Sequence, residues 1–130
     1  MRHLVLFLGI LLLAGCAATN GFISEQQARD IAIKASNSGH LKAVEPPANV
    51  RAEMITLETA RKRLAESGST ADGRNPGMMV WLITMEGTWT LSGGPPTPAG
   101  ATPAPQVVFH HYAVILDAKT GEQISEKATE

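Results

Sequence analysis

The chain has 130 residues, and its 11 Lys and Arg residues nearly balance its 12 Asp and Glu residues, giving a formal net charge of −1. Without a basic surplus the composition argues against a nucleic-acid partner, and without an acidic surplus it argues against a disordered chain. Once a leader is removed, the length suits one domain with a core of modest size.

The amino terminus has the three parts of a secretory signal. Arg2 precedes a largely apolar run at residues 4–13, and the small residues Ala14 and Gly15 follow it. As a helix, such a run spans roughly 15 Å, whereas the hydrocarbon core of a bilayer is about 30 Å thick. The segment therefore predicts a cleaved signal peptide at residues 1–15 and argues against a permanent spanning helix.

Cys16 is the only cysteine of the chain, and it ends the sequence Leu13-Ala14-Gly15-Cys16. This sequence resembles the lipobox of bacterial lipoproteins. The resemblance implies cleavage between Gly15 and Cys16 and lipidation of the Cys16 sulfur, with acyl chains such as palmitate; two or more chains anchor a protein stably. It also implies an extracytoplasmic location at the cell membrane or the outer membrane, with residues 16–22 as a lipidated tether. An ordinary signal peptide with an incidental cysteine is the alternative.

Two helices are expected in the first half of the remaining chain. Ser24 and Gln27 form an S-x-x-Q capping box, and the apolar residues after them recur at helical spacing, which predicts a helix over residues 25–37. Thr56 is placed to cap a second helix over residues 57–67, whose apolar face consists of Leu57, Ala60 and Leu64.

The strands are expected around and after the second helix. Residues 50–55 predict a short strand, while residues 78–91 and 107–117 are rich in β-branched, aromatic and other apolar side chains and predict two long strands. Gly87 is a candidate β-bulge in the first long strand. A turn follows the second, and residues 123–127 predict a returning edge strand.

A loop is expected between the two long strands, because residues 92–105 hold five of the eight prolines of the chain. Proline cannot donate a hydrogen bond to a neighbouring strand. The elements together predict an α+β fold, with two helices packed on one face of an antiparallel sheet of three or four strands.

In this order the elements resemble a PepSY domain. The similarity lies in residues 23–36, 80–86 and 112–122, the last of which ends Asp117-Ala-Lys-Thr-Gly-Glu122. The resemblance implies that residues 23–130 form one non-catalytic extracytoplasmic domain. Such domains occur in the propeptides of thermolysin-type metallopeptidases and as separate envelope proteins, and peptidase inhibition has been proposed for them. The chain departs from the pattern at the helix over 57–67 and at the Pro/Gly-rich loop over 92–105.

Three side chains near the ends of the long strands are candidate contacts for a partner: Trp89, His110 and His111. For Trp89 the alternative is packing under the proline-rich loop. Adjacent histidines on a strand point to opposite faces, so the pair does not predict a metal site. The basic run Arg61-Lys62-Arg63 spreads over about 200° of a helix and predicts a solvated surface. No catalytic motif is visible, and neither an enzyme nor a cofactor is expected.

The function we expect from the sequence is a lipid-anchored, extracytoplasmic, non-enzymatic binding domain. Its partners would be the membrane, through the lipid, and a protein such as a secreted peptidase or an envelope component. Two alternatives stay open. One is a structural or accessory envelope lipoprotein, and the other is a small-ligand carrier, which needs a concave apolar pocket.

Overall fold

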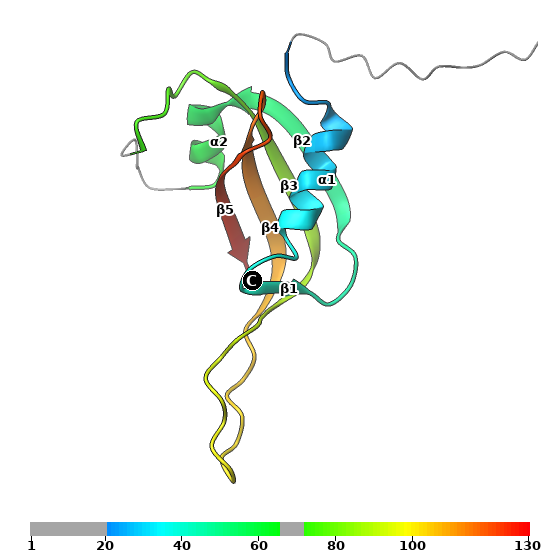
Figure 1. Ribbon diagram of the computed structural model, residues 1–130, viewed down its shortest axis with the longest axis vertical. Helices are drawn as coiled ribbons and strands as arrows, with labels where there is room; N and C mark the ends of the chain where they lie inside the picture. The colour runs from blue at the N-terminus through cyan, green and yellow to red at the C-terminus, as the bar shows by residue number, and fades with distance from the viewer. Residues whose placement is uncertain (1–20, 66–71) are drawn as a thin grey trace, which may run out of the picture.

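The computed structural model describes residues 21–65 and 72–130 (Figure 1). The expected signal peptide and nearly all of the tether, Gly15 and Cys16 included, lie outside these residues. The elements in chain order are α1 (Glu25–Ala35), β1 (Leu41–Ala43), β2 (Ala48–Thr56), α2 (Leu57–Arg63), β3 (Met79–Leu91), β4 (Val108–Asp117) and β5 (Gln123–Thr129).

The strands form one antiparallel sheet around β3. On one side β3 pairs with β4, which pairs in turn with β5. On its other side β3 pairs with two strands, β2 along residues Met79–Glu86 and β1 along residues Trp89–Leu91. The expected α+β fold, with two helices and an antiparallel sheet, is confirmed. The strand β1 was not expected from the sequence.

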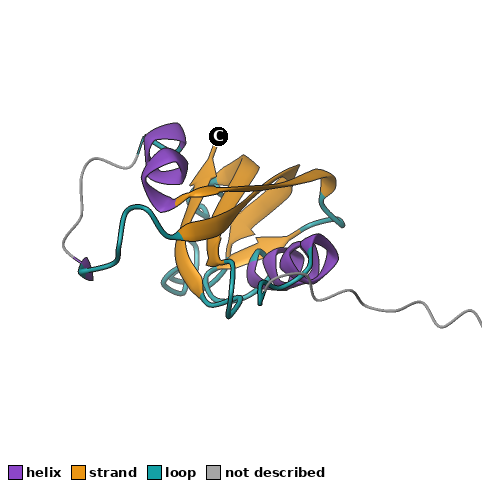
Figure 2. Ribbon diagram, turned by 90° about the horizontal axis from the view of Figure 1, so that it is seen from above, coloured by secondary structure: helices purple, strands orange, loops and turns teal. Residues whose placement is uncertain are grey.

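The two helices lie on opposite faces of the sheet and not together on one face (Figure 2). On the side that we call the α1 face, Ala28 and Ala32 of α1 pack with Trp81 and Ile83 of β3. On the opposite side, the α2 face, Leu57 and Ala60 of α2 pack with the alternate residues Val80 and Leu82 and with Ile115 of β4. The physical reason is that β3 and β4 are apolar on both faces, so that each face needs its own cover.

Local interactions fix where each helix starts. The Ser24 hydroxyl accepts a hydrogen bond from the Gln27 backbone N–H at 3.1 Å, and the Gln27 side chain accepts one from the Ser24 N–H at 2.9 Å, so the expected capping box is present. The Thr56 hydroxyl accepts from the Thr59 N–H at 3.3 Å. The helix α2 ends at Arg63, which is earlier than expected; the end of the expected span, residues 66 and 67, lies outside the described residues.

Gly87 lies at a bulge in β3, where the pairing with β4 shifts between Glu86 and Trp89. The Trp89 ring lies against Gly87 and packs on Tyr112, with ring centroids 5.7 Å apart. Trp89 is 0% exposed, so the expectation that its side chain offers an exposed partner contact is wrong. The reason is that Gly87 has no side chain, which leaves room for the indole ring in the core of the α1 face.

The ends of the β3–β4 hairpin differ in their surroundings. At the end where β3 begins, the backbone that enters α1 is held in place: the Ile23 N–H donates to the Ala118 carbonyl at 2.8 Å, and Trp81 Nε1 donates to the Ile23 carbonyl at 3.3 Å. At the other end, exposed residues 92–107 project beyond the sheet (Figure 1). The chain therefore enters the fold at the end of the hairpin opposite the proline-rich loop.

Tyr112, the only tyrosine of the chain, is 1% exposed. Its hydroxyl donates a hydrogen bond to the Glu126 carboxylate of β5. Burial, together with the adjacent carboxylate, raises the pKa of Tyr112 well above its ordinary value near 10. The phenol is therefore held in its protonated form in the folded chain.

Replacement of Gly87 by alanine should destabilise the fold, because the added Cβ would lie 2.9 Å from Cη2 of Trp89. Overpacking of this kind costs about 1–3 kcal/mol, which urea unfolding followed by tryptophan fluorescence would measure. Gly94→Ala is the matched control, because a Cβ at Gly94 meets nothing within 4 Å. Equal unfolding free energies for Gly87→Ala and the control would contradict the packing of Trp89 on Gly87.

Tyr112 should also make the fold sensitive to alkali. In the unfolded chain its phenol ionises near pH 10, while the folded chain keeps the proton, so stability holds below about pH 10 and falls above it by up to about 1.4 kcal/mol per pH unit. Urea unfolding between pH 8 and 11.5 should show this fall in the wild type and a smaller one in Tyr112→Phe. Phenolate absorbance that rises near pH 10 in a chain still folded by circular dichroism would disprove it.

Candidate functional site

The helix α2 covers only part of its face of the sheet. Leu57 and Ala60 cover Leu82 and Ile115, but the helix ends before it reaches the next side chains along the same face, Thr84 of β3 and Ala113 of β4. An open hollow of about 360 Å³ remains there. We refer to it as the hollow; its lining includes Arg51, Arg63, Thr84, His111, Ala113 and Lys127.

The register of the sheet explains the shape of the hollow. Arg51 of β2 pairs with Thr84, Thr84 with Ala113, and Ala113 with Lys127 of β5, so that these four residues form one row across four strands. The two small residues form the floor, and a cationic side chain stands at each end. At about 4.8 Å between neighbouring strands, the backbones of the outer two strands lie roughly 14 Å apart.

The carboxyl end of α2 is tied to both sides of this row. The Lys127 ammonium donates to the Leu64 carbonyl at 2.6 Å, and the Arg63 guanidinium forms an ion pair with Glu53 of β2. A cation is favourable at the carboxyl end of a helix because the last carbonyl groups have no partner within the helix. The Lys127 ammonium is thus bound at the end of α2, while the Arg63 guanidinium is bound to Glu53 on β2.

The remaining charged groups of the hollow come from β2, β3 and β4. The Asn49 side chain donates a hydrogen bond to the Glu86 carboxylate at 2.6 Å. His111 of β4 is the residue opposite Glu86 of β3 in the strand register. Arg51 is exposed, and its side chain takes part in no hydrogen bond or ion pair found among residues 21–65 and 72–130. Arg51, Arg63 and Lys127 line the hollow together with the Glu86 carboxylate. The Glu53 carboxylate offsets the charge of Arg63, and the three cations still outnumber these two carboxylates by one.

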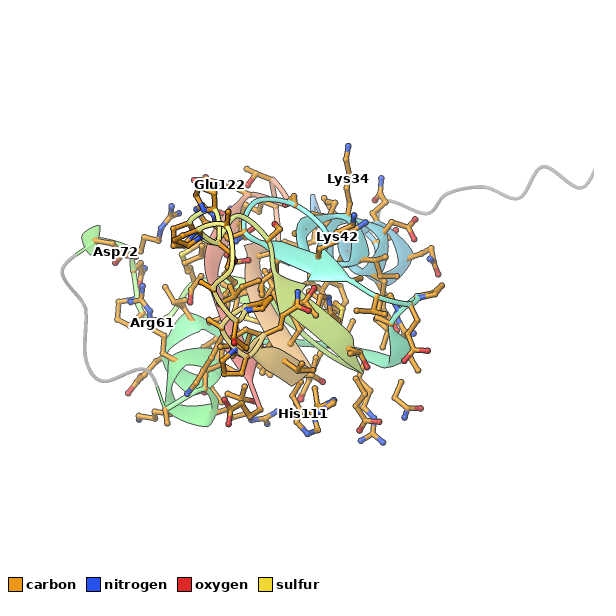
Figure 3. The ribbon with its side chains drawn as sticks, turned by 90° about the horizontal axis from the view of Figure 1, so that it is seen from below. Lys34, Lys42, Arg61, Asp72, His111 and Glu122 are labelled. Carbon is orange, nitrogen blue, oxygen red and sulfur yellow. The ribbon has the colours of Figure 1, made fainter. Side chains whose placement is uncertain are left out.

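The three expected contact residues are not brought together. His111 lines the hollow, on the side of the molecule away from Lys34 and Lys42 (Figure 3). His110 is exposed but lies outside the hollow, and Trp89 is buried on the α1 face. Of the three, only His111 therefore belongs to the candidate site.

The basic run of α2 is largely occupied by ion pairs. Arg61 pairs with Asp72 at 2.6 Å, and the hydrogen bond from Arg61 lowers the pKa of the Asp72 carboxyl. Lys62 pairs with Glu58 one helical turn earlier at 2.7 Å. The three cations of the run have three different partners, and only Arg63 lines the hollow.

Four residues of the hollow were not predicted from the sequence: Arg51, Thr84, Ala113 and Lys127. They lie in different strands, and only the pairing register brings them into one row. Two weak signals were available, a threonine and an alanine at the middle of otherwise bulky strands. Small side chains at such positions project little from the sheet and so indicate a depression in its surface.

Two further findings concern the described part of the chain. No group of three His, Cys, Asp or Glu side chains within residues 21–65 and 72–130 is arranged to hold a metal ion. Nor does a helix in those ranges combine the length and the apolar character needed to cross a membrane.

In comparisons with known proteins, no family model, no curated protein and no solved structure matches the chain. The hollow and the sequence around Cys16 are therefore the two features of the chain that indicate a function.

Proposed function

We propose that the chain is a lipid-anchored, non-enzymatic binding protein of the cell envelope, and that the hollow on the α2 face is its binding surface. The observation that carries the proposal is the incomplete cover of the sheet by α2. A face with large apolar side chains would need that cover, whereas Thr84 and Ala113 leave a concave surface with cations at its edge. Concave surfaces with a few fixed polar groups are typical of binding sites.

The position of the tether is compatible with this use of the hollow. Phe22, the last residue of the tether, and Ile23, which follows it, pack with the core of the α1 face, whereas the hollow opens on the α2 face. The tether, residues 16–22, extends at most about 25 Å. A chain anchored through Cys16 would therefore keep its attachment on one face of the sheet and its binding surface on the other.

The partner class that we favour is a protein, and the PepSY resemblance makes a secreted peptidase the first candidate. The binding protein would then modulate the activity of that peptidase. A structural or accessory role within an envelope assembly and a small-ligand carrier both stay as predictions of the sequence. Stable, stoichiometric recovery of envelope components would favour the structural role.

Lipidation can be tested directly by intact-mass spectrometry of the native protein. The expected mass is that of residues 16–130 plus lipid, because cleavage before Cys16 and acylation of its sulfur occur together. Cys16→Ser should lack the lipid mass, whereas the control Ala18→Ser should retain it. An unmodified thiol on a full-length chain would disprove the anchor.

Use of the hollow can be tested by filling it. Thr84→Trp places a large side chain on the exposed floor, and it should reduce recovery of the partner when the tagged chain is purified from membranes in mild detergent. Gln26→Trp, on the exposed surface of α1, is the matched control and should leave recovery unchanged. If both variants recover the same proteins as the wild type, including any secreted peptidase, the hollow is not the binding surface.

A further inference from the structure

The cations of the hollow are held at separate places. Lys127 is attached to the carboxyl end of α2 at the β5 side, and Arg63 is paired with Glu53 at the β2 side. Arg51 stands on β2 at the other end of the row from Lys127. One compact anion, such as a phosphate, would need these groups to converge on a single point. Charges at the two ends of a row instead match a ligand with negative groups set apart along its length.

Hydrogen-bond donors remain available along this row. A lysine ammonium has three donors, and one of those of Lys127 is engaged with Leu64. The Arg51 guanidinium has five donors, and none is used by a hydrogen bond found among the described residues. The Thr84 hydroxyl on the floor is exposed. A ligand that accepts hydrogen bonds therefore meets partners at both ends of the row and between them.

Glu86 limits where such a ligand can lie. Its carboxylate stands two residues beyond Thr84 on β3, where it accepts from Asn49, and it would repel a negative group placed beside it. The row from Arg51 to Lys127 has no carboxylate among its own members. The favourable path for an anionic chain thus crosses the strands along this row.

We propose that the hollow binds an extended acidic segment of a protein partner, with one carboxylate at Arg51 and a second at Lys127. The proposal rests on the proposed function, since it names the chemistry of the partner at the same surface. The segment lies across β2, β3, β4 and β5 over the floor of Thr84 and Ala113. Two carboxylates a few residues apart on an extended peptide span a distance of about 10–14 Å, which matches the width of the row.

Fluorescence anisotropy would measure the binding of fluorescein-labelled hexaglutamate to the full chain, which is kept in solution by an uncharged detergent. We expect saturable binding that weakens between 50 and 500 mM NaCl, because exposed ion pairs are screened by salt. Labelled hexalysine should not bind. Unlabelled hexaglutamate should displace the probe at a far lower concentration than inorganic phosphate or phosphatidylglycerol vesicles; displacement by either at the same anion concentration would overturn the proposal.

Charge-neutral variants locate the binding. Arg51→Gln and Lys127→Gln should each weaken hexaglutamate binding about tenfold, the effect of one charge-assisted hydrogen bond, and Arg51→Lys should recover part of the loss. Lys34→Gln removes the same charge from exposed α1 and should change the affinity less than twofold. Circular dichroism would verify that each variant is folded. Equal losses in Arg51→Gln and Lys34→Gln would show diffuse attraction and disprove the site.

The result is separable from that of the partner-recovery experiment. If hexaglutamate fails to bind while Thr84→Trp still abolishes recovery of the partner, the acidic-segment proposal is wrong and the hollow remains a binding surface for another chemistry. If hexaglutamate binds as expected while Thr84→Trp leaves partner recovery unchanged, the hollow has the inferred chemistry but the proposed function is wrong.

Discussion

The structure depends on one constraint, the burial of β3 on both of its faces. Val80 and Leu82 point to one side of the sheet while Trp81 and Ile83 point to the other, and all four are buried. A strand of this kind is stable only between two layers of cover. The helix α1 covers one face and α2 covers the other, and the neighbouring strands β2 and β4 satisfy the backbone hydrogen bonds on either side. The division of the two helices between the faces follows from this requirement.

The two helices meet the requirement to different extents. The helix α1 has eleven residues and α2 has seven. The shorter helix covers the row of Leu82 and Ile115 and stops before the row of Thr84 and Ala113. Thr84 in that second row is exposed and polar, and Ala113 is small and already buried, so neither side chain needs a longer helix as cover. The same row has Arg51 and Lys127 at its ends, and the end of α2 is held above it by Lys127 and by the pair of Arg63 with Glu53. A local lack of cover and an excess of positive charge thus coincide at one place.

The α1 face, by contrast, is closed by interlocking side chains. At the bulge, the Trp89 ring lies against Gly87 and packs on Tyr112. The Tyr112 hydroxyl in turn donates a hydrogen bond to the Glu126 carboxylate. Trp89 Nε1 is buried without a hydrogen-bond partner among the described residues, and the large apolar area of the indole outweighs that cost. The root of the proline-rich loop is therefore attached to a rigid part of the core. This packing also explains why a tryptophan beside an exposed loop does not serve as a surface contact.

The sequence by itself determined the fold class and every helix and strand except β1. Capping residues at Ser24 and Thr56, apolar periodicity, the bulge glycine and the prolines of residues 92–105 are local signals, and local physics acts on them without the rest of the chain. It also supplied the hypothesis of an anchor at Cys16, which depends on a short motif. The tertiary structure decided on which face each helix lies, the burial of Trp89, and the row from Arg51 to Lys127. These features depend on strand register and on pairing between residues up to 38 positions apart, and a shift of register by one residue would turn every one of those side chains to the other face.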